Sequence, residues 1–192
     1  KSEKIIEQDV TVLTNANYDH SGELVSLDLA VDNFSKSMVI TYGDLLYRGY
    51  VLKALMESKR DLTVIVDSSP LPKDGSFSGD FAYCSQSDNR EIWGRDILLD
   101  KISASPIVDQ RKCNGRWIGL LRVKGKGREI VENCLAELRA SDQFAKLSMT
   151  DLLNRIIQNG HSIRVIYIHG HWLNINSLVD LQNAGSFAEG DN

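Results

Sequence analysis

The chain has 192 residues, of which 42% are hydrophobic and 25% are charged, and its formal net charge at pH 7 is -4. This size predicts one globular domain that buries roughly 70% of the surface of its unfolded chain. The slightly acidic balance excludes the strong positive field that draws many proteins to nucleic acid. No apolar stretch approaches the roughly 20 residues that a membrane-spanning helix needs. We therefore expect a soluble, cytoplasmic protein that binds neither nucleic acid nor membrane.

The three cysteines, Cys84, Cys113 and Cys134, lie far apart and form no Cys-x-x-Cys pair. They are too few and too scattered for a disulfide framework, so we expect reduced thiols, as in a cytosolic protein. The chain begins at Lys1 rather than at a methionine. We therefore expect it to be the C-terminal portion of a longer protein.

The first part of the chain alternates between strand-like and helix-like segments. Apolar residues at steps of three and four, beginning at Leu24, predict an amphipathic helix for which Ser21 could supply the N-cap. A nearly continuous apolar run after Asp61 predicts a strand buried on both faces. We predict strands at 10–13, 38–42 and 62–66, with helices at 24–34 and 44–58 between them.

The second part begins with 68–79, which is rich in turn-forming residues and predicts a surface loop. Strands are then expected at 81–85, 97–102 and 117–123 as an antiparallel excursion, followed by helices at 130–138 and 149–159, a strand at 163–168 and a short closing helix. Capping signals precede the last two helices, at Ser148 with Asp151 and at Ser177 with Asp180. This order predicts the α/β class, with a mixed, mostly parallel sheet and flanking helices in a single domain spanning 1–192.

The most informative segment is 38–50, in which an apolar strand ends at Gly43, presents the carboxylate of Asp44 and turns into a helix. In α/β folds, ligands bind beyond the carboxyl ends of strands, so this position suggests a Mg²⁺ ligand. An aspartate at the start of a helix is also a common N-cap. Gly43 lets a ligand approach the backbone closely, which a cap does not require. Both interpretations of Asp44 stay open on these residues alone.

Trp117 stands among glycines in the segment 115–119. Its apolar neighbours favour a core aromatic residue, whereas the flanking glycines, including Gly119, would also permit close approach of a ligand. His169 and His171 resemble a zinc pair, but zinc usually needs three or four protein ligands and no other histidine has suitable spacing. For these two histidines we expect one exposed side chain and one hydrogen-bonded side chain.

Three segments in consistent order resemble the nucleotidyltransferase domain that is fused to phosphoenolpyruvate phosphomutase in phosphonate biosynthesis. They are YGDLLYR at 42–48, GRWIG at 115–119 and GHWLNINSLVDL at 170–181. That domain belongs to a wider group with the sugar-nucleotide pyrophosphorylases and the choline-phosphate cytidylyltransferases. The resemblance runs from about Val10 to Phe187 and is carried by three separate motifs.

The resemblance implies a Rossmann-like nucleotidyltransferase sheet and a reaction that couples a nucleoside triphosphate to a phosphate- or phosphonate-bearing acceptor. Pyrophosphate is released. The phosphonate examples imply CTP as the nucleotide, a compound such as 2-aminoethylphosphonate as the acceptor, and Mg²⁺ as the cofactor. A fused or associated phosphomutase is an implied partner, and a homo-oligomer is left open.

The resemblance also implies roles for individual residues. Asp44 would be the catalytic aspartate that holds Mg²⁺, and Asn176 would be the second metal-binding residue. On the substrate side stand Glu23, Asp67, Trp117, Gly119 and His171. For Glu23 and Asp67 the residues alone equally allow a first-turn acid that complements a helix dipole and a turn former.

The main departure from the family is an N-terminal one. Family members begin with a strand and a glycine-rich loop carrying Arg and Lys that grips the triphosphate, and no such segment precedes Val10. We therefore expect the domain to be N-terminally incomplete. Such a loop supplies backbone donors and cations for the β- and γ-phosphates, so nucleotide binding by these 192 residues alone should be poor.

Three functions compete at this stage. The first is the nucleotidyltransferase described above. The second is a non-catalytic remnant that serves dimerisation or regulates a phosphonate-pathway enzyme, which the neutral residues Asn174 and Asn176 favour. The third is a sugar-1-phosphate nucleotidyltransferase of the same fold, because a fold does not identify the acceptor.

Overall fold

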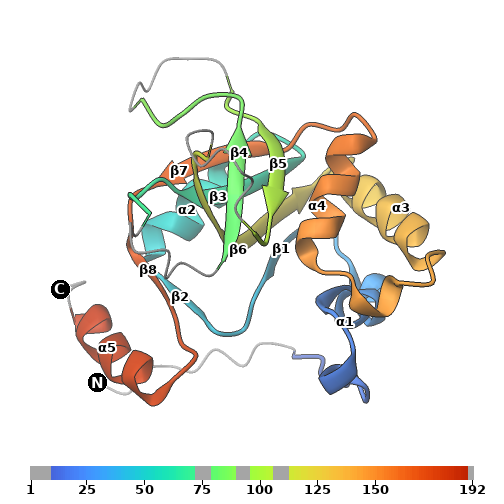
Figure 1. The fold of residues 1–192 in the computed structure, drawn as a ribbon, viewed down its shortest axis with the longest axis horizontal. Helices are drawn as coiled ribbons and strands as arrows, with labels where there is room; N and C mark the ends of the chain where they lie inside the picture. Colours follow the sequence, from blue (N-terminus) through green and yellow to red (C-terminus); the bar gives the residue numbers. More distant parts are fainter. Residues whose placement is uncertain (1–9, 72–78, 90–95, 106–112, 190–192) are drawn as a thin grey trace.

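The computed structural model describes residues 10–71, 79–89, 96–105 and 113–189. Figure 1 shows a twisted sheet at the centre with helices around it and the C-terminal helix beside a small second sheet. The central sheet consists of β1 (Ser37–Thr41), β3 (Leu62–Asp67), β4 (Asp80–Cys84), β5 (Leu99–Ser103), β6 (Gly115–Lys124) and β7 (Arg164–Ile168). The mixed α/β class predicted from the sequence is confirmed.

The strand β6 organises the central sheet. The strand order is β5-β4-β6-β3-β7, and β1 also pairs with β6. β3 and β7 run parallel, whereas β6 is antiparallel to β1, β3 and β4. Antiparallel pairs therefore predominate among the described strands, although a mostly parallel sheet was expected. The carboxyl ends of β1, β3 and β7 still meet at one edge of the sheet.

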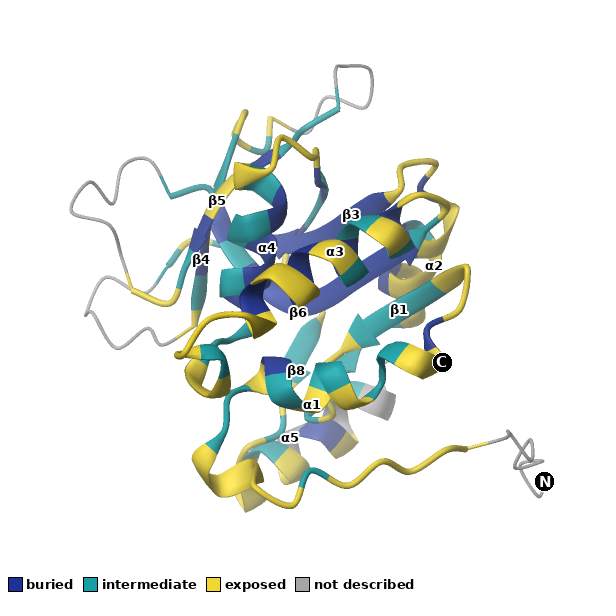
Figure 2. Cartoon of the chain, turned by 90° about the vertical axis from the view of Figure 1, so that its right-hand side faces the viewer, coloured by how far each residue is buried: buried dark blue, intermediate teal, exposed yellow. Residues whose placement is uncertain are grey.

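Helices cover both faces of this sheet (Figure 2). α1 (Glu23–Leu29), α3 (Gly127–Arg139) and α4 (Met149–Gln158) bury their apolar sides in the larger core, and α2 (Gly49–Glu57) packs on the other face. The two cores divide β3 between them, because Val64 and Val66 belong to the larger one and Ile65 to the smaller one. This alternation explains why the run at 62–66 is continuously apolar.

A second sheet of two strands lies beside the first. It pairs β2 (Leu45–Tyr47) with β8 (Trp172–Asn174), and α5 (Leu178–Glu189) follows β8. The helix predicted at 44–58 therefore begins only at Gly49. The prediction was wrong over the first residues because Leu45 to Tyr47 gain cross-strand hydrogen bonds from a segment more than 120 residues away, which no local pattern reveals.

Three short 3-10 helices complete the described secondary structure: η1 (Tyr18–His20), η2 (Val31–Asn33) and η4 (Phe144–Lys146). The predicted helix at 24–34 divides into α1 and η2, and Gly22 rather than Ser21 is the N-cap of α1. The strand expected at 10–13 does not form; these residues are irregular. Part of the predicted loop, 72–78, lies outside the described residues.

Both predicted capping signals are confirmed. Ser148 and Asp151 form a complete capping box at the start of α4. Ser177 and Asp180 exchange hydrogen bonds at the start of α5, with the Ser177 hydroxyl donating to the Asp180 carboxylate at 2.8 Å. Within the described ranges, no helix has both the length and the apolar character that crossing a membrane would require.

Gly22 fixes the docking of α1 onto the segment before α4. Its backbone N–H donates to Ala145 O at 2.6 Å, and a Cβ at this position would lie 2.2 Å from Leu147 O. We predict that Gly22→Ala lowers the free energy of unfolding by about 1–3 kcal/mol, as overpacking usually does. Urea denaturation measures this change.

The matched control is Gly49→Ala at the start of α2, where an added Cβ would meet no described atom within 4 Å. This substitution should be neutral or stabilise the fold by up to about 1 kcal/mol, because alanine restricts the unfolded chain. Equal effects of the two substitutions would contradict the proposed docking of α1.

Candidate functional site

The central sheet is split along one side of β6. β3 occupies the other side, so β1 and β4 share this one. The β1 register ends with Thr41 opposite Leu120, and the β4 register begins with Asp80 opposite Trp117. Tyr42 and Asp80 therefore face each other end to end across a short gap, at the edge where the carboxyl ends of β1 and β3 lie.

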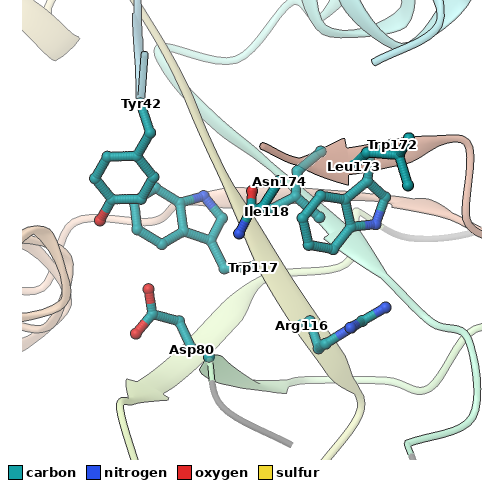
Figure 3. Close-up of a pocket in the computed structure, with 9 residues that line it drawn as sticks. Tyr42, Asp80, Arg116, Trp117, Ile118, Trp172, Leu173 and Asn174 are labelled. Atoms are coloured by element: carbon teal, nitrogen blue, oxygen red, sulfur yellow. The ribbon is translucent and has the colours of Figure 1, made fainter. Parts of the chain in front are cut away.

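A cavity of about 340 Å³ opens at this split. We call it the first cavity. It is lined by Tyr42, Gly79, Asp80, Arg116, Trp117, Ile118, Trp172, Leu173 and Asn174. Aromatic rings therefore face a small number of polar groups, which is the usual composition of a small-molecule site. Figure 3 shows the Asp80 carboxylate on the side of Tyr42 and Trp117, and the Arg116 side chain on the side of Trp172.

Tyr42 is fixed at the gap between β1 and β4 by contacts with Glu23, Trp117 and Gly119. Its hydroxyl donates to Glu23 Oε2 at 3.0 Å, and its ring lies 5.7 Å from the Trp117 ring at 59°. Gly119 has a φ of 90°, and a Cβ there would lie 2.3 Å from Tyr42 Cδ2. Gly119 thus makes room for the tyrosine ring. Burial, together with the negative charge of Glu23, raises the pKa of Tyr42, so its hydroxyl stays protonated.

Glu23 joins Tyr42 to α4. The same carboxylate oxygen that accepts from Tyr42 also accepts from Met149 N at 2.8 Å, at the positive end of the α4 dipole. Glu23 was predicted to bind substrate, and it does not line the first cavity. It borders a second cavity on the other side of Tyr42.

Asp67 lies at the end of β3 with none of its surface exposed. Its Oδ1 accepts from Ser69 N at 2.9 Å and Gly170 N at 3.0 Å. Its Oδ2 accepts from Trp172 Nε1 at 2.9 Å and Arg116 at 2.7 Å. Burial by itself would raise the pKa of this carboxyl, but the hydrogen bonds outweigh burial and lower it.

Asp67 was predicted to lie on the substrate side, and the structure gives it an indirect position. Fully buried and bonded to four donors, the carboxylate does not reach the first cavity itself. It instead holds Arg116 and Trp172, which do line that cavity, and the Arg116 guanidinium lies 5.0 Å from the Trp172 ring centre. A substrate-side role of Asp67 itself therefore stays a prediction.

Asp80 is the acidic residue of the described cavity wall. Burial and the nearby negative charge of Glu23 raise the pKa of the Asp80 carboxyl to about 6. The cation of the wall, Arg116, is already paired with Asp67. A ligand that binds in the first cavity would therefore need a positive group to balance the charge of Asp80.

Asp44 lies in the turn between β1 and β2, beside the end of β8. Its carbonyl oxygen accepts from Ile175 N at 2.7 Å, and its neighbour Leu45 pairs with Asn174. Asn174 lines the first cavity, and Asn176 follows two residues later with an exposed side chain. The structure therefore brings the predicted metal ligands Asp44 and Asn176 into neighbouring segments, and Asp44 is not the cap of α2, which begins at Gly49.

The donor set at this turn is poor in charge. In the part of the chain that the structure describes, no group of three or more His, Cys, Asp or Glu side chains could hold a metal ion. One carboxylate with amide oxygens nearby fits Mg²⁺ only when substrate phosphates and water complete the coordination. This set does not fit zinc, which prefers nitrogen and sulfur ligands.

His171 lies outside the first cavity. Its ring Nδ1 is 2.7 Å from the Tyr50 hydroxyl, the two rings pack edge to face, and its backbone has a φ of 65°. Both His169 and His171 are exposed, and His171 is the hydrogen-bonded one, so the expectation of one exposed and one hydrogen-bonded histidine is met in part. Trp117 is 4% exposed and belongs to the core, as its apolar neighbours favoured. It also lines the first cavity, where a ligand could approach it.

Sequence reasoning missed Asp80 and did not single out Tyr42 or Arg116 within their motifs. Asp80 follows a turn-rich segment and carries no motif, so the signal that identifies it is its place opposite Trp117 in the β4–β6 register. Register between distant strands is not visible in a single sequence.

The fold is that of nucleotidyltransferases. An inositol-1-phosphate CTP transferase from T. maritima matches with a TM-score of 0.63 and 17% sequence identity, over 91% of this chain and 62% of that one. A UDP-glucose pyrophosphorylase complexed with UDP-glucose matches with a TM-score of 0.65 and 10% identity, over 90% of this chain and 64% of that one.

A CTP:phosphocholine cytidylyltransferase from Streptococcus pneumoniae matches with a TM-score of 0.58 and 13% identity, over 91% of this chain and 67% of that one. No protein-family model and no curated protein sequence matches the chain. The chain thus spans about two thirds or less of the length of these solved structures. At such low identities the likeness establishes the fold.

The buried carboxylate of Asp67 generates a stability prediction. Asp67→Asn removes the charge opposite Arg116 and turns an amide donor toward groups that themselves donate. We expect the free energy of unfolding at pH 7 to fall by about 3–5 kcal/mol, as for other broken buried ion pairs. Urea denaturation measures it. The control Asp96→Asn weakens two partly exposed ion pairs, with Arg60 (62% exposed) and with Arg164 (34% exposed), and should cost at most about 2 kcal/mol.

The same comparison has a defined pH dependence. Because folding lowers the pKa of Asp67 below its ordinary value of about 3.9, its stabilisation is complete above that pH and is lost as the pH falls toward the folded-state pKa. The difference in stability between the natural protein and Asp67→Asn should shrink progressively below about pH 4. A difference that grows on acidification would contradict this assignment.

Proposed function

We propose that this chain carries out Mg²⁺-dependent nucleotidyl transfer from a nucleoside triphosphate, with CTP as the expected donor, to a phosphonate or phosphate acceptor such as 2-aminoethylphosphonate. The observation that supports it best is the first cavity, which opens at the carboxyl ends of β1 and β3 beside the turn that carries Asp44. The nucleotidyltransferase fold and the three sequence motifs agree with this placement.

The reaction joins two anions. An oxygen of the acceptor's phosphonate attacks the α-phosphorus of the triphosphate, a new P–O bond forms, the bond from the α-phosphorus to the oxygen bridging to the β-phosphate breaks, and pyrophosphate leaves with that electron pair. Asp44 and the amide oxygen of Asn176 would hold Mg²⁺, which would supply positive charge to balance the phosphate groups. The turn beside β8 would fix both ligands by its backbone hydrogen bond to Ile175.

Asp80 favours an acceptor with a positive group. The carboxylate lies on the same side of the first cavity as the rings of Tyr42 and Trp117, and an ammonium there would gain an ion pair as well as attraction to the aromatic faces. 2-Aminoethylphosphonate has such a group at the end opposite its phosphonate. A sugar 1-phosphate does not, although sugar-nucleotide enzymes share the fold.

The non-catalytic alternative rests on the same turn. Asn174 and Asn176 carry no charge, and Asp44 is the acidic residue of the predicted ligand set. A site with one carboxylate binds Mg²⁺ weakly unless phosphates are present. A regulatory or dimerisation module with this fold would tolerate the loss of Asp44, whereas the enzyme would not.

We predict that Asp44→Asn lowers pyrophosphate release at least 100-fold without loss of folding. The full-length gene product is incubated with Mg²⁺, each of the nucleoside triphosphates, and 2-aminoethylphosphonate, phosphocholine or glucose 1-phosphate. Coupled detection of pyrophosphate gives the rates, and circular dichroism checks the fold. Asp142→Asn, at an exposed position, is the matched control and should retain the full rate.

Two results would exclude the proposed function. The first is no pyrophosphate release from the natural full-length protein with any nucleotide and acceptor pair. The second is an unchanged rate in Asp44→Asn, which would favour the non-catalytic module. A preference for glucose 1-phosphate over both cationic acceptors would instead favour the sugar nucleotidyltransferase.

Asp80→Asn tests the recognition of the ammonium group. Loss of an ion pair to a charged group costs about 1.5–3 kcal/mol, so we expect the KM for 2-aminoethylphosphonate to rise roughly 10- to 100-fold with a smaller change in kcat. The KM for glucose 1-phosphate should not rise in the same way. Steady-state kinetics on both acceptors provide the comparison.

The Asp80 interaction should also depend on pH. The carboxyl is ionised above its pKa of about 6 and neutral below it, so the advantage of the natural protein over Asp80→Asn should disappear as the pH falls through 6. The acceptor's phosphonate titrates in a similar range, as phosphates do, so the ratio of the two proteins is the relevant quantity. A ratio that is constant from pH 5 to about pH 8 would contradict this role.

A further inference from the structure

We infer that Tyr42 is a specificity-determining residue: its ring is the wall between the first cavity and a second cavity, and it limits the size of the acceptor that can be used. The inference rests on the proposed function for the identity of the two ligands. The wall itself rests on the geometry around Tyr42.

The second cavity has a volume of about 350 Å³ and lies between α1 and the end of β1. One face of α1 supplies Glu23, Ser26, Leu27 and Ala30, β1 and the following turn supply Ile40, Thr41, Tyr42 and Gly43, and Met149 closes the end. Most of this lining is apolar, and hydroxyl groups of Ser26 and Thr41 stand at its border. A flat heterocycle with polar edges, such as a nucleobase, fits this chemistry.

Tyr42 is the residue that the two described linings share. The next residue, Gly43, lines the second cavity, and Asp44 follows it in the turn before β2. The first residue of β2, Leu45, pairs with Asn174, which lines the first cavity. The two cavities therefore lie on opposite sides of the Tyr42 ring, and both border residues next to the turn that carries Asp44. This arrangement suits two ligands that react with each other beside Asp44.

Each cavity borders one carboxylate, but Glu23 of the second cavity already accepts hydrogen bonds from the Tyr42 hydroxyl and Met149 N. The first cavity, with Asp80, therefore takes the cationic acceptor, and the second cavity, whose other lining residues are mostly apolar, takes the nucleoside. The acceptor then extends from Asp80 toward Asp44 along the Tyr42 ring. A larger ammonium group would press on this ring, so the ring sets the limit.

The ring cannot easily move aside. Its hydroxyl is tied to Glu23, and Glu23 is tied to the backbone of Met149 at the start of α4. One ring edge rests on Gly119, where not even a Cβ would fit, and Trp117 packs against it. A side chain held from three directions is a fixed wall rather than an adaptable one.

The experiment compares Tyr42→Ala with Tyr42→Phe in the full-length gene product. The alanine variant joins the two cavities, and the phenylalanine variant keeps the ring and loses the hydroxyl. For phosphocholine relative to 2-aminoethylphosphonate, we expect the ratio of kcat/KM values to rise about tenfold or more in Tyr42→Ala, since added methyl groups in a pocket change specificity by roughly that factor. Tyr42→Phe should keep the natural ratio within about threefold.

Tyr18→Ala is the control, because Tyr18 is 70% exposed on η1. Tyr42→Leu replaces the alanine variant if that protein does not fold, and should give an intermediate ratio. An unchanged ratio in a folded Tyr42→Ala or Tyr42→Leu protein that still uses both acceptors would overturn the inference.

A binding measurement separates this inference from the proposed function. Trp117 packs on Tyr42, so tryptophan fluorescence is expected to report binding of phosphocholine or 2-aminoethylphosphonate without turnover. If the natural protein releases no pyrophosphate, the proposed reaction is wrong, and the ratio of the two dissociation constants still tests the wall. An equal ratio in the natural protein and Tyr42→Ala, or no binding of either compound, would overturn it.

Discussion

The arrangement of the candidate site depends on one buried carboxylate. Asp67 ends β3, accepts from the backbone that leads into β8, and pairs with Arg116 on β6. These groups come from three distant parts of the chain, and each donor would lose a well-placed acceptor without the carboxylate. Trp172 joins the same oxygen through its indole N–H. Asp67 thus fixes Arg116 and Trp172, which line the first cavity, although Asp67 itself does not line it.

The second constraint is steric and acts on the ring of Tyr42. Gly119 interrupts β6 in a left-handed conformation where no side chain would fit against Tyr42. The pairing of β6 with β3 also shifts register near this point. That shift lies on the β3 side of β6. On the opposite side, β1 pairs only as far as Leu120 and β4 begins opposite Trp117, so Tyr42 and Asp80 face each other across the gap between the two registers. The first cavity opens at this gap.

The sequence predicted the elements whose signals are local. The strand at 62–66 and the capping box at Ser148 formed as expected, and the helix predicted from Leu24 formed as the shorter α1 followed by η2. The strand β2 was not predicted, because three residues that pair with a distant strand carry no sequence pattern of their own. Asp44 was chosen as a candidate metal ligand from its place after a strand, and its surroundings depend on the same pairing of β2 with β8. Asp80 was missed for a related reason, since its partner is set by strand register.

Charge balance connects these separate observations. Arg116 forms an ion pair with Asp67, so the carboxylate of Asp80 gives the described lining of the first cavity a negative charge. Asp44 lies in the turn beside β8, outside the described lining of that cavity. Under the proposed function, an acceptor with an ammonium and a phosphonate would complement both carboxylates, the ammonium facing Asp80 and the phosphonate reaching a cation held at Asp44. The length of the acceptor along the Tyr42 ring would then be the remaining determinant of fit.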